Sequence, residues 1–350
     1  MTEADQRLCP TPFARFQHIT MAHGGGGRLS AELLRDVFLP AYGNASLQQR
    51  NDAACIAFPA NARAALTTDS YVVQPLRFPG GNIGRLAVCG TINDLVVTGA
   101  VPLGLTVGWI LEEGFTMAEL RYLAEEMGRA AAEADVAIVA GDTKVIERGR
   151  GDGCYINTSG LGWLAPERDL GPHRIRAGDA ILISGTIGEH GMAILSLRHG
   201  LPFSSSLVSD CAALHGLTAY WLSNVPQVRA MRDATRGGLS AVLHEMATAS
   251  GCGIVIDEPA VPVSDSVRAA CELLGLDPWL VANEGKLVAF VPAEHADRAL
   301  NLLKQHPLGH QAARIGTVVA DHSGRVVAKT SLGTQRWVHW PQGDQLPRIC

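Results

Sequence analysis

Five aspartates stand in short motifs of small and polar residues that suit binding of a cation and a phosphate. They are Asp52 in NDAA, Asp69 in TTDS, Asp94 in NDL, Asp142 in GDTK and Asp233 in DATRGG. A carboxylate among apolar neighbours costs free energy unless it is paired or bound to a cation, and Mg²⁺ commonly shares oxygen ligands with nucleotide phosphates. Each aspartate alone is more often a cap or turn residue. Several of them at the ends of elements make a magnesium–phosphate site a competitive interpretation.

A run of glycines near the N-terminus could supply contacts to the phosphate. Gly24, Gly25, Gly26 and Gly27 have no side chains to block a close approach, and successive backbone N–H groups can form an anion nest. The run is not a Walker loop, because no Gly-Lys-Ser/Thr follows it, and it is not a GxGxxG motif after a strand. A flexible linker is at least as good an interpretation of these glycines alone.

Three further polar residues could take part in binding or catalysis. Ser30 is placed to cap a helix expected over residues 31–38, whose N-terminus would add positive potential near the glycines. Lys144 follows Asp142 by two residues and places a cation beside that carboxylate. Glu284 lies in ANEGKL, just before the apolar run LVAFV, where it could act as a general base, although such a glutamate is more often a turn residue.

The sequence closes on a cysteine, Cys350, in GDQLPRIC. The ordinary interpretation of a terminal residue is a frayed end. No two of the eight cysteines have the spacing of a zinc knuckle or a Cys-x-x-Cys motif, and most of them lie in apolar company, as in LAVCG. This pattern favours a reducing, cytoplasmic setting in which Cys350 stays a thiol.

The composition bounds the class of protein. A chain of 350 residues suggests two domains, and 47% hydrophobic with 18% charged residues indicates a globular fold. A net charge of −5 and a pI of about 6.2 argue against a dedicated nucleic-acid surface. No segment approaches the roughly 20 apolar residues of a membrane span, and the N-terminus does not resemble a signal peptide. We therefore expect a cytoplasmic protein with neither nucleic acid nor membrane as a partner.

Hydrophobic periodicity predicts alternating strands and helices that would position these residues. In the first half we expect strands at 66–73, 103–111, 137–142 and 154–164, and helices at 81–98 and, after the capping box of Thr116 and Glu119, through Ala134. In the second half we expect strands at 181–185, 253–257, 287–291 and 314–319, and helices at 188–199, 237–250, 264–274 and 293–305. The prediction is a layered α/β or α+β unit in each half.

A segment rich in proline, glycine and charge, around residues 165–178, reads as the boundary between the two units. The predicted organisation is a lead-in at 1–20, a first domain at 21–165, a second domain at 176–335 and a flexible tail at 336–350 that carries Cys350.

The motifs taken together resemble the HypE family of hydrogenase maturation factors. The resemblance rests on TTDS, FPGGNIGRLAVCGTINDLVVTGAVP, VAGDTKV, DATRGGL, NEGK and the terminal PRIC, and it runs from about residue 18 to the last residue. The long motif and the terminal cysteine are specific to that family. TTDS and NDL are shared with its superfamily, which includes aminoimidazole ribonucleotide synthetase, selenophosphate synthetase and thiamine-phosphate kinase. The resemblance implies a PurM-like fold with an N-terminal domain for ATP binding and dimerisation.

The resemblance also implies an activity. In the family, the carbamoyltransferase HypF places a carbamoyl group on the C-terminal cysteine, and HypE uses ATP to dehydrate it to a thiocyanate. The cyanide passes through a HypC–HypD complex to the iron of a nickel–iron hydrogenase. The implied cofactors are ATP and Mg²⁺, and the implied assembly is a homodimer that shares first-domain strands across its interface.

Carried over to this sequence, the resemblance gives each candidate residue a role. Cys350 carries the substrate, Glu284 is the base and Lys144 stabilises developing charge. Nucleotide contacts fall to Gly24, Gly25, Gly26, Gly27, Asp69, Asn93, Asp94, Asp142 and Thr143, and metal contacts to Asp52, Asp69, Asp94, Asp142 and Asp233.

Two other classes of protein are alternatives. Another PurM-like synthetase or kinase would act on a free small molecule and would have no use for a terminal cysteine. A binding module could use the tail as a docking peptide or a lipid anchor, but a prenylated CaaX box requires the cysteine four residues from the end. ATP turnover with a carbamoylated tail would separate the enzyme from the binding module.

Overall fold

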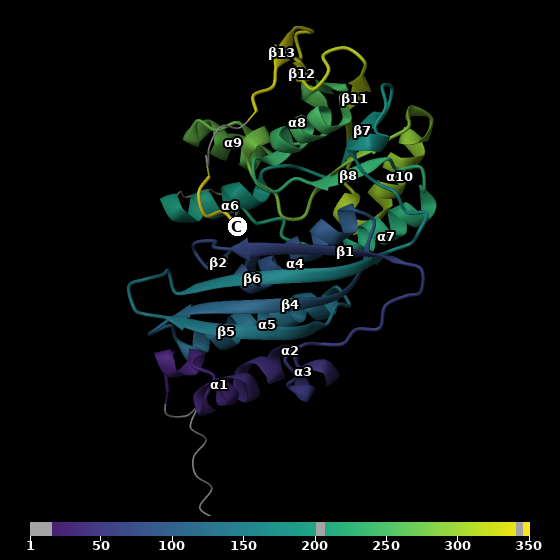
Figure 1. The fold of residues 1–350 in the computed structure, drawn as a ribbon. Helices are drawn as coiled ribbons and strands as arrows, with labels where there is room; N and C mark the ends of the chain where they lie inside the picture. The colour runs from purple at the N-terminus through teal and green to yellow at the C-terminus, as the bar shows by residue number, and fades with distance from the viewer. Residues whose placement is uncertain (1–15, 201–206, 341–345) are drawn as a thin grey trace, which may run out of the picture.

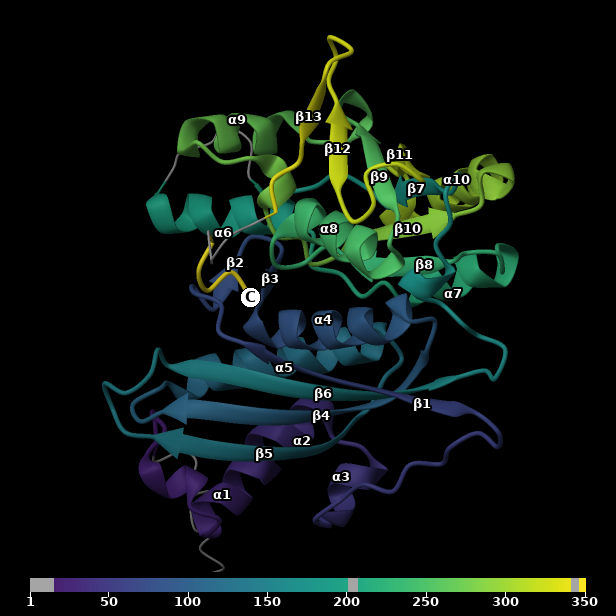
Figure 2. The same ribbon diagram turned by 45° about the horizontal axis from the view of Figure 1, so that its top comes forward.

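The structure, a computed structural model, describes residues 16–200, 207–340 and 346–350. These residues form two layered domains stacked one on the other, and the C-terminal end of the chain lies between them (Figures 1 and 2). The predicted α/β class and the division into two domains are confirmed. No helix among the described residues is long and apolar enough to cross a membrane.

The N-terminal domain is built on a four-stranded sheet. In spatial order its strands are β1 (Arg63–Tyr71), β6 (Cys154–Leu164), β4 (Val101–Glu112) and β5 (Ile138–Ile146). β6 pairs antiparallel with β1 and with β4, whereas β4 and β5 run parallel. In the part of the chain that the structure describes, β1 and β5 each pair on one side only and are the two edges of the sheet.

Two helices cover one face of this sheet. Helix α4 (Ile83–Val97) begins at Asn82, whose side chain accepts the N–H of Arg85, and it is buried almost all round because it lies between the sheet and the second domain. Helix α5 (Met117–Glu133) begins at Thr116, whose hydroxyl accepts the N–H of Glu119, as the capping motif predicts.

The first helices differ from the prediction. Helix α1 (Arg28–Leu33) begins after Gly27 and continues through a π-helical turn (Leu34–Phe38) into α2 (Leu39–Tyr42). Ser30 therefore lies inside the helix, and its predicted role as a cap is wrong. Its hydroxyl instead donates to the carbonyl of His23 and accepts the N–H of Gly26, which closes the glycine loop.

The C-terminal domain has a seven-stranded sheet with helices packed against it. In spatial order the strands are β13 (Gln335–Trp337), β12 (Val326–Lys329), β9 (Gly253–Asp257), β11 (Ala313–Val319), β7 (Ala180–Ile183), β10 (Leu287–Val291) and β8 (Ala230–Asp233). The helices are α6 (Glu189–His199), α7 (His215–Asn224), α8 (Gly238–Ser250), α9 (Asp265–Leu274) and α10 (Ala296–Gln305). Strands β7 and β10 are buried along their whole length, so they form the core of the domain.

Several short elements were not predicted. They are α3 (Ala45–Gln49), α7, β8, β12, β13 and the hairpin of β2 (Arg77–Phe78) with β3 (Gly81–Asn82). The predicted tail boundary at residue 336 falls within β13, and Val338 is still buried against the second domain.

The last five residues lie along the chain that follows β1. The N–H of Val72 donates to a main-chain carboxylate oxygen of Cys350 over 3.1 Å, and the N–H of Gln74 donates to the carbonyl of Arg348 over 3.3 Å. The end of the tail is therefore placed in the junction of the two domains.

Candidate functional site

The predicted site residues fall into two separate pockets. One pocket, here the seam pocket, lies at the domain junction and has a volume of about 190 Å³. It is lined by Thr68, Asp69, Gly90, Asp94, Arg232, Asp233, Thr235, Arg236, Glu284 and Cys350. The other, here the edge pocket, lies between β5 and the first helices and has a volume of about 290 Å³. Its lining includes Gly24, Gly26, Asp52, Asp142, Thr143 and Lys144.

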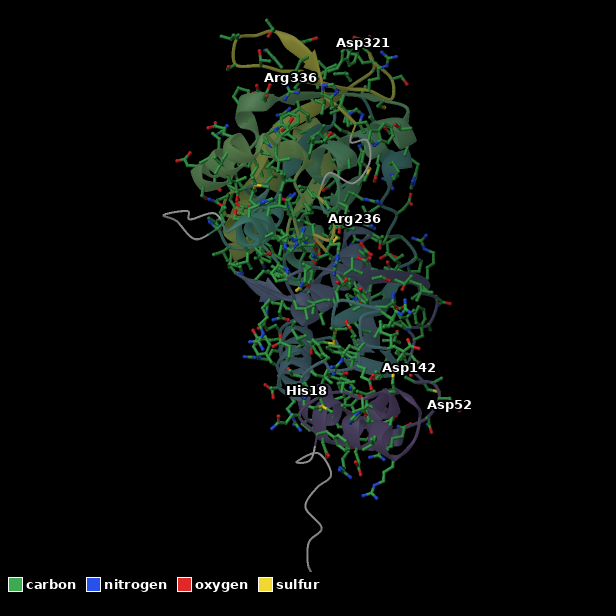
Figure 3. The ribbon with its side chains drawn as sticks, turned by 90° about the vertical axis from the view of Figure 1, so that its left-hand side faces the viewer. His18, Asp52, Asp142, Arg236, Asp321 and Arg336 are labelled. Carbon is green, nitrogen blue, oxygen red and sulfur yellow. The ribbon has the colours of Figure 1, made fainter. Side chains whose placement is uncertain are left out.

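The separation of the two pockets is visible in the molecule as a whole. Asp52 and Asp142 lie together low on the N-terminal domain, whereas Arg236 of the seam pocket lies at the level of the domain junction (Figure 3). A single copy of the chain therefore does not bring the five predicted metal-binding aspartates together.

Four acids from four elements line the seam pocket. Asp69 comes from β1, Asp94 from α4, Asp233 from the end of β8 and Glu284 from the loop before β10. Leu287 of β10 is the register partner of Asp233, so the pairing of these strands places Asp233 close to the Glu284 loop. The hydroxyl of Thr67 donates to Asp94 over 2.7 Å and fixes that carboxylate.

Burial and mutual repulsion raise the pKa values of three of these acids. Burial, with the nearby charge of Asp94, raises the pKa of Asp233 to about 7. Burial also raises the pKa of Asp94, against the opposing effects of its Thr67 hydrogen bond and of Arg232 and Arg236. The pKa of Glu284, whose side chain is 2% exposed, lies well above its ordinary value because of burial and of Asp210, Asp233 and Asp69. Such a group of acids must hold protons or a cation.

The seam acids do not yet have the geometry of a metal site. No three His, Cys, Asp or Glu side chains among the described residues are grouped closely enough to hold a metal ion. The chemistry of the donors nevertheless fits Mg²⁺, because carboxylate oxygens are its preferred protein ligands and a cation would relieve the repulsion between the buried Asp233 and Asp94.

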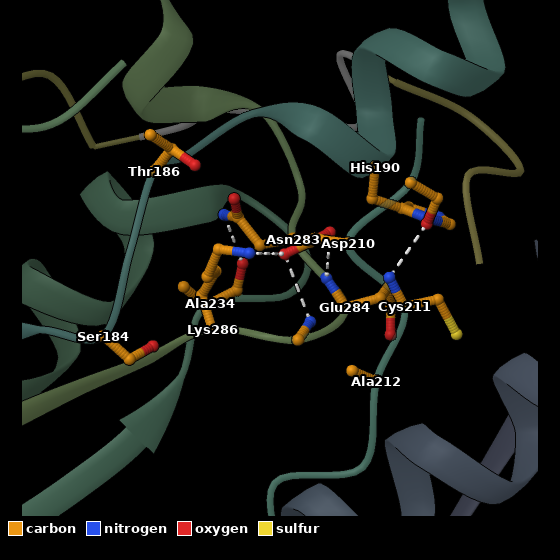
Figure 4. Close-up of polar contacts among 12 residues, drawn as sticks. Ser184, Thr186, His190, Asp210, Cys211, Ala212, Ala234, Asn283, Glu284 and Lys286 are labelled. Atoms are coloured by element: carbon orange, nitrogen blue, oxygen red, sulfur yellow. Dashed lines mark hydrogen bonds and ion pairs between the residues drawn. The ribbon is translucent and has the colours of Figure 1, made fainter. Parts of the chain in front are cut away.

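The loop that carries Glu284 is held by a buried carboxylate. Asp210 accepts the N–H groups of Glu284 and Gly285 over 3.0 and 3.2 Å, and it pairs with the ammonium of Lys286 over 3.2 Å (Figure 4). Asn283 donates to the carbonyl of Ala234 over 2.8 Å. These bonds fix the backbone at Glu284, and this residue lines the seam pocket together with Cys350.

Asn93, a predicted nucleotide contact, is used differently. Its amide donates to the carbonyls of Ala212 and Glu284 and accepts the N–H of Leu214. It lines neither pocket, so its position favours a role in joining α4 to the Glu284 loop rather than contact with a nucleotide.

The edge pocket is open and its charges are solvated. The ammonium of Lys144 pairs with Asp142 over 2.9 Å, and the two side chains are 65% and 68% exposed. The hydrogen bond from Lys144 lowers the pKa of Asp142. An apolar wall that includes Phe38, Tyr42 and Trp109 closes the inner side, where the indole of Trp109 donates to Tyr42.

The glycine run contributes to the edge pocket in two ways. A Cβ at Gly24 would lie 2.5 Å from the backbone nitrogen of Val145, so this position needs glycine for packing against β5. Gly26 has a φ of 77°, which favours glycine, and its N–H bonds Ser30. Gly25 and Gly27 do not line the pocket.

Four residues beside the seam pocket were missed by the sequence analysis: His190, Arg198, Ser209 and Asp210. The carbonyl of Ile349 accepts a hydrogen bond from His190, and those of Pro347 and Arg348 accept hydrogen bonds from Arg198. In this region only Lys286 belongs to a recognisable sequence motif, NEGK. The four missed residues come together through packing of segments that are distant in the sequence.

Comparison with known proteins identifies relatives of the whole chain. Residues 50–164 match the N-terminal domain, and residues 176–329 the C-terminal domain, of AIR synthase related proteins. The chain is 53% identical over 332 residues to the carbamoyl dehydratase HypE of Cupriavidus necator, with 95% of each chain covered.

Solved structures show the same relationship. A crystal structure of the hydrogenase maturation protein HypE in complex with ATP matches 94% of this chain and 99% of its own, with a TM-score of 0.91 and 46% identity. A crystal structure of a HypE–HypF complex matches 88% of this chain and 99% of its own, with a TM-score of 0.78 and 45% identity. The expected PurM-like architecture is thereby confirmed.

Proposed function

Because this chain belongs to the HypE family of carbamoyl dehydratases, we propose that it uses ATP to dehydrate a carbamoyl group on its own Cys350 to a thiocyanate. The observation that carries the proposal is the position of Cys350, which lines the seam pocket together with Asp69, Asp94, Asp233 and Glu284. The thiol of Cys350 thus lies in the same pocket as the acidic and basic side chains that phosphoryl transfer requires.

The reaction runs in two steps whose atoms balance. The carbamoyl oxygen attacks the γ-phosphorus of ATP, ADP leaves and one N–H proton is lost, which gives an imidate that carries phosphate on its oxygen. The C–O bond then breaks, phosphate leaves with the former carbamoyl oxygen, and loss of the second N–H proton gives S–C≡N. The first step turns a poor leaving group into a good one, and the second needs a base.

The seam pocket supplies groups for both steps. Glu284, whose backbone is held by Asp210, lines the same pocket as Cys350 and in its ionised form takes the proton from nitrogen. Arg232 and Arg236 line the same pocket and stabilise charge on the phosphate oxygens. Asp69, Asp94 and Asp233 would hold Mg²⁺, which neutralises phosphate charge when it is bound.

We further propose that the edge pocket completes this site from a second copy of the chain. Strand β1 carries Asp69 and strand β5 carries Asp142 and Lys144, and these are the two edges of one sheet. Pairing of β1 with β5 of a second copy, repeated by twofold symmetry, would join the two sheets into one closed barrel. This assembly would place the edge pocket of each copy beside the seam pocket of the other.

The outer face of the sheet supports the same assembly. Leu66 of β1 is 78% exposed, and Val101 and Ile110 of β4 are also exposed. Burial of these side chains inside a closed two-copy barrel would stabilise the dimer. In this arrangement Gly24, Asp52, Asp142, Thr143 and Lys144 act on ATP bound at the partner's acids.

The partners follow from the chemistry and the relatives. The HypE–HypF complex is a similar structure, so we propose a HypF carbamoyltransferase as the source of the carbamoyl group. A HypC–HypD complex is the proposed acceptor of the cyanide. The docked tail must leave the seam pocket to meet either partner.

Mass spectrometry of the tail tests the proposal. After loading by a HypF carbamoyltransferase, the C-terminal peptide should carry one carbamoyl group on Cys350, and addition of ATP and Mg²⁺ should remove one water from it. Cys350→Ala should bind ATP but carry neither modification. A carbamoyl group that stays intact with ATP, or that maps to another cysteine, would contradict the proposed function.

A further inference from the structure

The end of the tail is held mainly through its backbone carbonyls. Arg198 donates one guanidinium N–H to the carbonyl of Pro347 over 2.6 Å and another to the carbonyl of Arg348. His190 donates from Nε2 to the carbonyl of Ile349 over 2.8 Å. Val72 donates to a carboxylate oxygen of Cys350, so each residue from 347 to 350 has a donor on its main-chain oxygen.

Side chains fix the register of the tail as well. Ile349 is buried in the core of the domain junction. The guanidinium of Arg348 pairs with Asp152 over 2.8 Å and donates to the carbonyl of Val72 over 3.2 Å. A shift by one residue would expose Ile349 and break both sets of bonds, so the position of Cys350 in the seam pocket is set by its neighbours.

His190 belongs to a directional chain of hydrogen bonds. The carbonyl of Ile349 can only accept, so Nε2 of His190 carries the proton and Nδ1 accepts from the hydroxyl of Ser209 over 2.8 Å. That hydroxyl in turn accepts the N–H of Cys211 over 3.1 Å. The ring is completely buried, and burial lowers its pKa, which agrees with a neutral imidazole.

The next residue of the same segment holds the opposite side of the site. Asp210 lies between Ser209 and Cys211 and accepts the backbone N–H groups of Glu284 and Gly285 (Figure 4). One three-residue segment, 209–211, is therefore linked to the tail through the bond of Ser209 to His190, and it contacts the Glu284 loop directly through Asp210.

We propose that His190, Arg198 and Ser209 form a tail clamp that positions Cys350, and that Asp210 joins this clamp to the loop of Glu284. The residues are positioning residues, because none of them lines the seam pocket. The inference rests on the proposed function only in taking the tail as the substrate; the docking itself is a property of the contacts.

Alkylation of Cys350 measures the clamp without any catalysis. The full-length protein is treated with iodoacetamide at fixed pH, and modification of Cys350 is followed by peptide mass spectrometry. His190→Ala and Arg198→Ala should each speed alkylation roughly tenfold, the size expected for loss of one or two hydrogen bonds that hold the tail. His190→Gln, whose amide can still donate to Ile349 and accept from Ser209, should restore most of the protection.

His244→Gln is the matched control. His244 is also a buried histidine that donates to a carbonyl of the C-terminal segment, Val338, but near the root of the tail. Its replacement should leave alkylation of Cys350 within about twofold of wild type, because a hydrogen bond that does not hold the tip contributes nothing to docking. Melting temperatures of all variants show whether the fold is kept.

Asp210→Asn separates the two sides of the segment. It should leave alkylation within about twofold but slow single-turnover dehydration roughly tenfold or more, because small displacements at a reacting centre are costly. Wild-type protection of Cys350 in folded His190→Ala and Arg198→Ala would overturn the clamp, even if wild-type protein makes thiocyanate. Loss of protection in those variants without thiocyanate in wild type would instead support the clamp and contradict the proposed function.

Discussion

The seam pocket and the edge pocket contain the same kinds of residue in opposite environments. In the seam pocket, burial raises the pKa values of Asp94, Asp233 and Glu284, and a hydrogen bond from Thr67 fixes Asp94. In the edge pocket, Asp142 and Lys144 pair in solvent, and the pKa of Asp142 is lowered by its partner. The four acids of the seam pocket outnumber its two arginines, whereas the edge pocket presents a solvated ammonium, Lys144, on an open strand edge. The contrast suggests that they are two halves of one site.

The largest expected effect is that of removing the seam carboxylate of Asp94, which would hold Mg²⁺. Asp94→Asn should keep the fold, because the amide oxygen can still accept from Thr67, but should lower Mg²⁺-dependent ATP turnover roughly 100-fold or more. Asp169→Asn, at an exposed ion pair with His173, is the control and should turn over ATP like wild type. Activity of the Asp94 variant within about threefold of wild type would remove Asp94 from the metal site.

Variants of Glu284 and Lys144 should slow different steps of the reaction. Glu284→Gln should accept the carbamoyl group and should slow thiocyanate formation roughly 100-fold, because a general base is lost. Lys144→Ala should slow the phosphoryl step, by roughly tenfold, because one solvated cation is lost. Quenched-flow measurement of ADP and of the tail mass distinguishes them. Normal thiocyanate formation by Glu284→Gln, or normal ADP formation by Lys144→Ala, would reject the corresponding role.

Docking of the tail should weaken in acid. Burial holds the pKa of His190 below its ordinary value of 6.5; Asp210 and the hydrogen bond to the carbonyl of Ile349 oppose this shift, and Arg198 adds to it. The docked state therefore disfavours the proton, and the docking free energy, complete above pH 6.5, is lost as the pH falls below it. The NMR shift of the Ile349 δ-methyl group should move toward the undocked value between pH 7.5 and roughly 5.5. An equal response in His190→Gln would assign the effect to another group.

The smallest expected effect is on stability, and it comes from substitutions in the glycine run. It shows which of these glycines is needed for packing. Gly24→Ala would place Cβ 2.5 Å from the nitrogen of Val145 and should lower the free energy of unfolding by about 1–3 kcal/mol. Gly27→Ala meets nothing within 4 Å and should melt like wild type. Equal melting temperatures for the two variants would show that the glycine loop is not packed against β5.

Local signals in the sequence predicted most of the fold. The cap at Thr116 and the left-handed Gly251 after α8 mark helix ends through bonds to neighbouring residues, so the sequence shows them directly. Helix α7 was missed because HGLTAYWLSN has no clear apolar stripe, and only packing on α4 and α10 explains it. The motifs identified the seam and edge residues, but their division between two pockets depends on strand order. The contacts of Asp210 and His190 depend on packing across the domain junction.

A shared active site is tested most directly by mixing two inactive variants. Asp69→Asn disables the seam pocket and Asp142→Asn the edge pocket, so each homodimer should lack dehydration activity. In an equal mixture after subunit exchange, half of the dimers are mixed, and each of these has one site with both aspartates intact. The mixture should then recover about a quarter of the wild-type activity, since one of the two sites works in half of the dimers. An inactive mixture that contains mixed dimers by native mass spectrometry would contradict a site built from two copies.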